Sequence, residues 1–517
     1  MKIRIVKGFF INFLYFLLFI NHGIAQPNPG DVFREYYWYN KNGDAGQALR
    51  VGGQVGYGGR NITLFHDFDL ENAIKAEVII EKIQCHDGTL GLSISINDSD
   101  WILVPEPDSI PVPKDQYQHH FYPVIEIPLS MLKTGTGNVF KMKVSDFHAW
   151  NWPQNLINGV HFRIYYDAAK KDHPTGEMVV PVSGNKIGDT VFLRADVSSP
   201  NGNIKQVDYI GLYDDVNFEG DGIYYQWHYH YFHGIIINHL GTVKEAPYQL
   251  SWDTTWVPDQ SRPIQIAARI IDETGMIFMT QPITDLELDR ENVSVELCKP
   301  YEQDRQWVTR KYNKKEKFDI SGDPDKISGV KLVWSSWSPG YMNGVYINNK
   351  KVFDKEGPLY QYCAHRVDID SLNVFQNGKN ILMTGQSLAV NGQTVHGMEV
   401  NWPGIMVLIR YETMTPSNVG EMQNQSDFEL IQNYPNPFNS ATTIRYTLLE
   451  QAEVKCHIHS VSGQIVRTLV DDHQDAGVRE VIWNGADDLG ITVGSGLYFC
   501  CLNVNNNIST RKLLFMK

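Results

Sequence analysis

The sequence predicts an all-β protein built from several sandwiches. Short alternating or apolar runs, such as residues 76–80, 91–96 and 162–166, recur between Gly, Asn, Asp and Pro residues. No long stretch shows the 3.6-residue period of an amphipathic helix. A length of 517 residues indicates several domains rather than one. We therefore expect two jelly-roll β-sandwiches that flank an Ig-like sandwich, followed by a C-terminal Ig-like domain.

An internal repeat supports the two jelly rolls. Residues 93–97 (Ser-Ile-Ser-Ile-Asn) parallel residues 345–349 (Val-Tyr-Ile-Asn-Asn). Each is followed by a short turn closed by glycine and asparagine, at 127–139 and at 367–382. Asn-Trp-Pro then precedes a strand in both regions. Two copies of one β-sandwich are the simplest account of this order.

The two copies resemble the galactose-binding-like jelly rolls attached to many glycoside hydrolases, through the strand ending in Ile-Asn and the turn with Leu, Gly and Asn. This resemblance implies binding of sugars, although the same fold also serves as a spacer. Between the copies, the strands at 190–197, 207–213, 248–252 and 264–271 resemble a bacterial Ig-like or fibronectin-like domain.

The C-terminal region begins at Asn433-Tyr434-Pro435-Asn436-Pro437-Phe438-Asn439, where two prolines fix a tight extended turn. Alternating strands follow at 442–448, 454–459 and 465–470, and the chain ends in Lys512-Leu513-Leu514-Phe515-Met516-Lys517. This ordered set closely resembles the C-terminal sorting domain of the Bacteroidetes type IX secretion system. The resemblance implies export and contact with the secretion machinery.

The N-terminus has the pattern of a secretory signal peptide. Lys2, Arg4 and Lys7 precede an apolar run over 9–20, and Gly23-Ile24-Ala25 provides small residues for cleavage. The run is too short for a comfortable transmembrane helix, and no other stretch approaches the needed length. We therefore expect a secreted or outer-membrane surface-attached protein of a Gram-negative, Bacteroidetes-like bacterium, with no transmembrane span after processing.

These patterns give a domain plan. We expect a signal peptide at 1–25, a jelly roll at 31–180, an Ig-like sandwich at 181–290, a second jelly roll at 291–412, a polar linker at 413–428 and the sorting domain at 429–517.

The net charge restricts the class of partner that we expect, and the cysteine content restricts the number of disulfides. The formal net charge is −14, which argues against nucleic acid or an anionic membrane as the main partner and is compatible with neutral glycans, divalent cations or basic partners. Of the six cysteines, Cys456, Cys500 and Cys501 lie in the sorting domain. The other three are far apart, so they allow at most one intramolecular disulfide and no disulfide framework.

The loop at 215–222 is a candidate cation site. Asp215, Asn217, Glu219 and Asp221 place oxygen-bearing side chains at alternate positions, a spacing that suits the many oxygen ligands of Ca²⁺. No glutamate at the twelfth position completes an EF-hand. The alternative is a solvated acidic turn.

A histidine cluster follows this loop. His228 and His230 share one strand face, and with a third ligand from His233 or His239 they could hold Zn²⁺ or Cu²⁺. Histidines in β proteins are also common as hydrogen-bonded packing residues, so both interpretations stay open.

Aromatic side chains are candidates for sugar stacking. Trp334, Trp337 and Tyr341 surround a Ser-Pro-Gly turn, where we expect a loop. Trp150 and Trp152 form a second candidate, and Trp402 beside Asn401 a third. A Trp-Pro pair that opens a core strand can equally be a packing corner.

No catalytic motif of the Gly-x-Ser-x-Gly, P-loop or His-Glu-x-x-His type is present. We therefore expect a non-catalytic protein that binds a polysaccharide or cell-surface glycan, with Ca²⁺ as its one candidate cofactor. The alternatives are a polysaccharide lyase or glycoside hydrolase on a jelly roll, a metal-dependent oxidase that uses the histidines, and a structural adhesin.

Overall fold

The computed structural model describes residues 27–39, 49–52, 59–64, 66–84, 91–144, 155–232, 234–387, 396–412, 428–430, 433, 435–448, 451–460, 464–504 and 507–516. The chain divides into two compact units, residues 1–413 and 414–517. Among the described residues every helix is a short 3₁₀ turn, namely Lys114–Gln116, Leu129–Met131, Pro324–Lys326, Pro339–Tyr341 and Leu372–Val374. The predicted all-β, multi-domain fold class is therefore confirmed.

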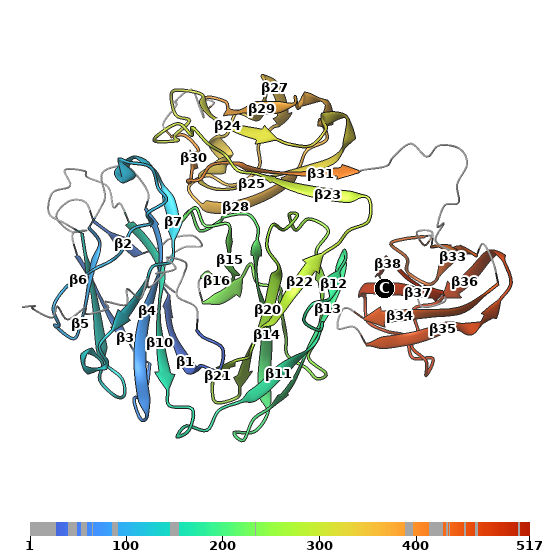
Figure 1. Ribbon diagram of the computed structural model, residues 1–517, viewed down its shortest axis with the longest axis horizontal. Helices are drawn as coiled ribbons and strands as arrows, with labels where there is room; N and C mark the ends of the chain where they lie inside the picture. The colour runs from blue at the N-terminus through green and yellow to red at the C-terminus, as the bar shows by residue number, and fades with distance from the viewer. Residues whose placement is uncertain are drawn as a thin grey trace, which may run out of the picture. The chain divides into compact units, whose positions relative to one another are not determined.

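The first jelly roll packs two sheets around an apolar core (Figure 1). One sheet contains β1 (Val32–Tyr39), β2 (Leu49–Val51), β4 (Ala73–Gln84), β7 (His119–Phe121), β8 (Val124–Ile127) and β10 (Asn155–Tyr166). The other contains β3 (Gly59–Leu64), β5 (Ser93–Ile96), β6 (Ile102–Leu103) and β9 (Asn138–Lys143). Alternate residues of both sheets, such as Phe140 and Phe162, are fully buried between them, as the period of two requires.

The central sandwich has its own core. Its larger sheet contains β12 (Lys186–Ile187), β14 (Ile204–Asp214), β15 (Tyr225–His228), β18 (Gly241–Val243), β20 (Ile264–Asp272), β21 (Met276–Met279) and β22 (Ile283–Leu288). The smaller sheet contains β11 (Thr175–Val180), β13 (Thr190–Ser198) and β19 (Gln249–Asp253). Strand β11 precedes the expected boundary at residue 180, yet it pairs with β13 of this sandwich.

The large sheets of these two sandwiches are continuous. Strand β1 pairs with β10 on one side and with β21 on the other, where Val32 lies opposite Phe278. The hairpin of β16 (His230–Phe232) and β17 (Ile235–Ile237) contributes Tyr231 to a buried cluster with Phe33, Tyr165 and Ile277 from the joined sheets. Two sandwiches that the sequence presents as separate domains thus share one hydrogen-bonded sheet.

The second jelly roll repeats the plan of the first. One sheet contains β23 (Val293–Cys298), β25 (Ile327–Trp337), β28 (Tyr362–Asp368), β30 (Glu399–Val400) and β31 (Met406–Glu412). The other contains β24 (Lys314–Ile320), β26 (Val345–Ile347), β27 (Lys350–Phe353) and β29 (Gly378–Thr384). Residues of both sheets form one buried core.

Matching hydrogen bonds support the internal repeat. In the first jelly roll Asn97 Nδ2 donates to Asn138 Oδ1 at 2.8 Å, and Asn97 Oδ1 accepts from the Val139 backbone at 2.9 Å. In the second, Asn348 Nδ2 donates to Asn380 Oδ1 at 2.7 Å, and Asn348 Oδ1 accepts from the Ile381 backbone at 3.1 Å. The same pair of asparagines therefore fastens the same turn in both copies.

The C-terminal unit is a small sandwich. Its sheets contain β32 (Phe428–Leu430), β33 (Thr442–Leu448) and β36 (Gly477–Trp483), and β34 (Ala452–Ser460), β35 (Ile465–Gln474), β37 (Gly496–Val504) and β38 (Asn507–Phe515). The first asparagine of the opening motif, Asn433, donates to Thr442 Oγ1 at 2.7 Å, and the ring of Phe438 lies 4.9 Å from that of Phe515. This motif therefore closes the sandwich against its last strand.

Candidate functional site

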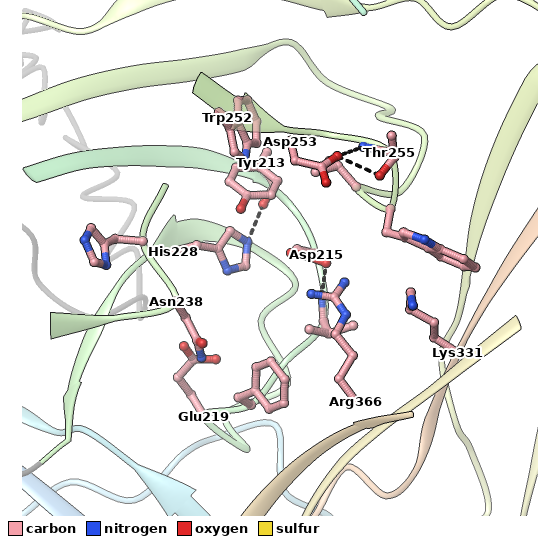
Figure 2. Close-up of a pocket in the computed structure, with 15 residues that line it drawn as sticks. Tyr213, Asp215, Glu219, His228, Asn238, Trp252, Asp253, Thr255, Lys331 and Arg366 are labelled. Carbon is pink, nitrogen blue, oxygen red and sulfur yellow. Dashed lines mark hydrogen bonds between the residues drawn. The ribbon is translucent and has the colours of Figure 1, made fainter. Parts of the chain in front are cut away.

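A cavity of about 370 Å³ lies between the central sandwich and the second jelly roll (Figure 2). Most of its wall comes from the central sandwich: the end of β14, the loop after it, β15, the residues after β17 and the turn that follows β19. The opposite wall comes from β25 and β28. The lining includes Tyr213, Asp215, Glu219, His228, Trp252, Asp253, Trp256, Lys331 and Arg366.

Aromatic rings form the inner part of this cavity. The ring of Tyr213 lies 5.4 Å from Trp252 and 4.5 Å from His228. Trp256 is half-buried and packs near Gly329, where an added Cβ would lie 3.2 Å from the indole. The cavity therefore offers apolar ring surface next to its polar groups.

The carboxylates that line the cavity differ in their partners. Glu219 Oε1 lies 3.1 Å from His230 Nδ1, and Asp253 Oδ1 accepts bonds from the backbone and hydroxyl of Thr255 at 3.0 and 2.6 Å. Asp215 Oδ1 accepts from the next backbone amide at 2.8 Å and from no other described residue. Burial raises the pKa of Asp215, against the opposing charges of His228 and Arg366. Asp215 is thus the carboxylate with the most remaining acceptor capacity.

Two cations face these carboxylates from the second jelly roll. The Lys331 ammonium pairs with Asp368 and lies 4.5 Å from the centre of the Trp256 ring. Arg366 is exposed, and it makes no ion pair within the described part of the chain. Figure 2 shows Asp215 and Arg366 pointing toward one another from the two walls.

The structure brings together three of the four residues of the expected cation loop. Asn217 Nδ2 donates to Asp221 Oδ1 at 2.7 Å and lies 3.4 Å from Glu219 Oε2. The amide therefore occupies the position between the carboxylates, while Asp215 points into the cavity. No group of three or more His, Cys, Asp or Glu side chains among the described residues is placed to hold a metal ion. Ca²⁺ binding by this loop stays a prediction.

The two described strand histidines have protein partners. His228 Nε2 lies 2.8 Å from the Tyr213 carbonyl oxygen, and His230 lies between Glu219 and Asn238, whose Nδ2 is 3.3 Å from His230 Nε2. His233 lies outside the described residues. His228 and His230 thus make hydrogen-bonding contacts within the protein, and Zn²⁺ or Cu²⁺ binding by these histidines stays a prediction.

The four predicted sugar-stacking aromatics that the structure describes are not among the residues that line the cavity. Trp334 and Trp337 belong to β25 rather than to a loop, so that expectation is wrong; the alternation of β25 directs the Trp334 ring into the core, where it is fully buried and stacks 4.3 Å from His365. Tyr341 is buried in a 3₁₀ turn and donates to the Tyr360 hydroxyl at 2.8 Å. Trp402 is half-buried, and an added Cβ at Gly222 would meet its ring.

Trp150 and Trp152 lie outside the described residues. The cavity residues that sequence reasoning missed are Tyr213, Trp252, Trp256, Lys331 and Arg366. The pair of tryptophans around Asp-Thr-Thr at 252–256 was a usable signal, because aromatics beside a carboxylate are typical of sugar sites. Nothing in the local sequence distinguishes Arg366 from other strand arginines.

A second polar junction joins the first jelly roll to the central sandwich. Arg163 lies 3.1 Å from Glu35 and 3.3 Å from Glu77, and Arg269 lies 2.7 Å from Glu35 and 3.4 Å from Asp208. Both guanidinium groups are 1% exposed. Burial alone would raise the pKa of Glu35, but Arg269 and Arg163 lower it to about 2. We name this set of five residues the buried ion network.

Residues 432–516 match a family described as the secretion system C-terminal sorting domain. This part of the chain is a sorting domain. The resemblance inferred from the Pro-Asn-Pro turn and the strand order is thereby confirmed, and the sorting domain implies contact with the type IX secretion machinery. The protein is therefore secreted or attached to the cell surface of a Bacteroidetes bacterium.

Further comparisons add little about the remaining chain. Similar solved structures include dimeric latent PorU from Porphyromonas gingivalis (12% identity, 69% of this chain and 35% of that chain, TM-score 0.18). They also include the fibronectin(III)-like modules of CbhA from Clostridium thermocellum (13%, 49% and 94%, 0.16) and a DUF4785 family protein from Legionella pneumophila (10%, 87% and 94%, 0.20). The chain thus spans about a third of the PorU chain. No curated protein matches the sequence.

Within the described ranges, no helix combines the length and the apolar character needed to cross a bilayer. The expected signal peptide at 1–25 and nearly all of the expected linker at 413–428 lie outside those ranges. Both stay predictions. The cysteines that the structure describes, Cys298, Cys363, Cys456, Cys500 and Cys501, are free thiols.

Proposed function

We propose that this exported protein binds carbohydrate, and that the binding site is the cavity between the central sandwich and the second jelly roll. One observation carries the proposal: the cavity places aromatic rings beside Asp215 and Arg366, which make no ion pair with each other or with other described residues. Its volume of about 370 Å³ lies within the range of small-molecule sites.

Each type of side chain in the cavity has a role in sugar recognition. A ring such as Trp256 offers an apolar face to the C–H groups of a pyranose. The Asp215 carboxylate can accept hydrogen bonds from sugar hydroxyls, and the Arg366 guanidinium can donate to ring or hydroxyl oxygens. The side chains that line the site therefore suit a hydroxylated ring better than an apolar ligand.

A glycan array of the mature chain, followed by affinity electrophoresis, tests the proposal. We expect retardation by at least one polysaccharide and a loss of about tenfold or more in affinity for Asp215→Asn, because a hydrogen bond to a charged group contributes about 1.5–3 kcal/mol. Asp325→Asn is the matched control, since Asp325 is exposed and lies outside the cavity. Equal binding by wild type and Asp215→Asn, or no binding at all, contradicts the proposed site.

A second candidate function is a polysaccharide lyase or glycoside hydrolase, and His228 is the observation that favours it. Its Nε2–H donates to a backbone carbonyl, which can only accept, so in the neutral ring Nδ1 carries a lone pair. Such a nitrogen beside the Asp215 carboxylate could act as a general base. Release of reducing ends or of unsaturated sugars from a bound polysaccharide, abolished in His228→Gln, separates catalysis from binding alone.

A further inference from the structure

Arg366 differs from the other cations at the junctions of the large unit. Lys331, on the same wall, pairs with Asp368. Each arginine of the buried ion network contacts two carboxylates. Arg366 lines the cavity from the exposed face of β28 and makes no ion pair with any described carboxylate. Its full hydrogen-bonding capacity therefore faces the cavity.

The carboxylates of the cavity do not neutralise this guanidinium. Glu219 is engaged by His230, and Asp253 by Thr255. Asp215 is close enough for Arg366 to oppose the rise in its pKa, yet the two make no ion pair. A ligand between the two walls would consequently meet a hydrogen-bond acceptor on one side and, on the other, a cation that no described carboxylate pairs with.

We infer that the ligand is a sugar that carries an anionic group, and that Arg366 binds this group. The inference rests on the proposed function, because it assumes a saccharide in the cavity. A guanidinium presents paired N–H donors that match the two oxygens of a carboxylate, and it also binds sulfate oxygens. Asp215 then accepts hydroxyl hydrogens of the same ring.

Because the chain as a whole is acidic, selectivity for an anionic sugar has to come from cations inside the cavity. With a formal net charge of −14, the protein repels acidic polysaccharides at long range. Acidic sugars therefore bind only where a cation is placed against them. Lys331, which pairs with Asp368, lies on the same wall beside Trp256.

Isothermal titration calorimetry on the mature chain compares four probes of equal length: an oligogalacturonate, its full methyl ester, a sulfated galactan oligomer and a neutral galactan oligomer. We expect at least one anionic oligomer to bind about tenfold or more tightly than its neutral counterpart. We expect Arg366→Gln to remove this preference and Arg366→Lys to keep part of it. The control is Arg310→Gln, which should leave the preference intact, because Arg310 is an exposed arginine of the same jelly roll outside the cavity.

The outcomes are separable. Preference for the galacturonate or for the sulfated oligomer identifies the anionic group and supports the inference. Equal affinity for charged and neutral oligomers, or a preference that survives Arg366→Gln, overturns the inference and leaves the proposed function standing. If none of the four probes binds and the glycan array is also negative, both the inference and the proposed function are wrong. Unchanged melting of Arg366→Gln shows that loss of preference is not loss of folding.

Discussion

The central sandwich meets its two neighbours through polar junctions of opposite character. Against the first jelly roll, Arg163 and Arg269 are 1% exposed and each contacts two carboxylates. Against the second jelly roll, Asp215 and Arg366 face a cavity without forming an ion pair. The charges of the first junction are paired with each other, whereas Asp215 and Arg366 of the second make no ion pair with described residues.

This difference gives a criterion for distinguishing structural polar groups from functional ones. A buried charge costs several kcal/mol to desolvate, so a fold retains it only with partners, and the partners of the buried ion network lie on three strands of one continuous sheet. A half-exposed, unpaired charge in a cavity contributes little to stability. Variants of the two junctions should therefore affect different measurements.

The largest effect is expected from Arg269→Gln. The substitution leaves Glu35 and Asp208 short of a cation in a buried site, and removal of one partner of a buried ion pair costs about 3–5 kcal/mol. Urea unfolding followed by tryptophan fluorescence measures the loss in the large unit. Arg262→Gln, at an exposed arginine of the same sandwich, is the control. Equal midpoints for Arg269→Gln and wild type would show that the network does not hold the junction.

Acid should weaken the same junction. The folded pKa of Glu35, about 2, is below its ordinary value of 4.5, so the unfolded chain takes up a proton first as the pH falls. The stabilisation is complete above pH 4.5 and is lost as the pH drops toward 2. At 1.36 kcal/mol per pKa unit this amounts to about 3 kcal/mol. Glu35→Gln should flatten this part of a melting-temperature profile against pH. A profile as steep as that of wild type would assign the acid sensitivity to other groups.

Arg366→Gln should lower ligand affinity and leave stability nearly unchanged, the opposite of what we expect for Arg269→Gln. Because Arg366 is exposed and makes no ion pair with a described residue, we expect the unfolding free energy to change by no more than about 0.5 kcal/mol. Affinity for an anionic oligosaccharide should nevertheless fall by about tenfold. A clear drop in the unfolding midpoint would mean that Arg366 has a structural role and would weaken the contrast between the junctions.

The smallest effect is expected from Lys331→Gln. Its ammonium is already paired with Asp368, which is 70% exposed, and pairs of this kind contribute about 0.2–1 kcal/mol. We expect a change of about twofold in affinity for the anionic oligomer by calorimetry. A loss as large as that of Arg366→Gln would move the anion-binding role from one cation to both.

Local patterns were sufficient for much of the fold. Alternating residues such as those of 91–96 and 162–166 predicted buried sheet faces, and the Ile-Asn turns at Asn97 and Asn348 predicted a repeat that the paired asparagine hydrogen bonds support. Trp334 shows where this reasoning failed. A strand that continues to Trp337 looks loop-like in sequence because a Ser-Pro-Gly turn follows it directly. Only its pairing with β28 and β31 shows that it is a strand with a buried ring.

The sequence by itself determined the all-β class, the repeated jelly roll and the sorting domain, because each depends on contacts within a short span or on an ordered set of local motifs. Only the tertiary structure decided the junctions. Glu35, Arg163 and Arg269 come from strands far apart in the chain, as do Asp215 and Arg366. Whether a charge finds a partner or faces a cavity depends on which strands the sheets bring together, and no local pattern encodes that choice.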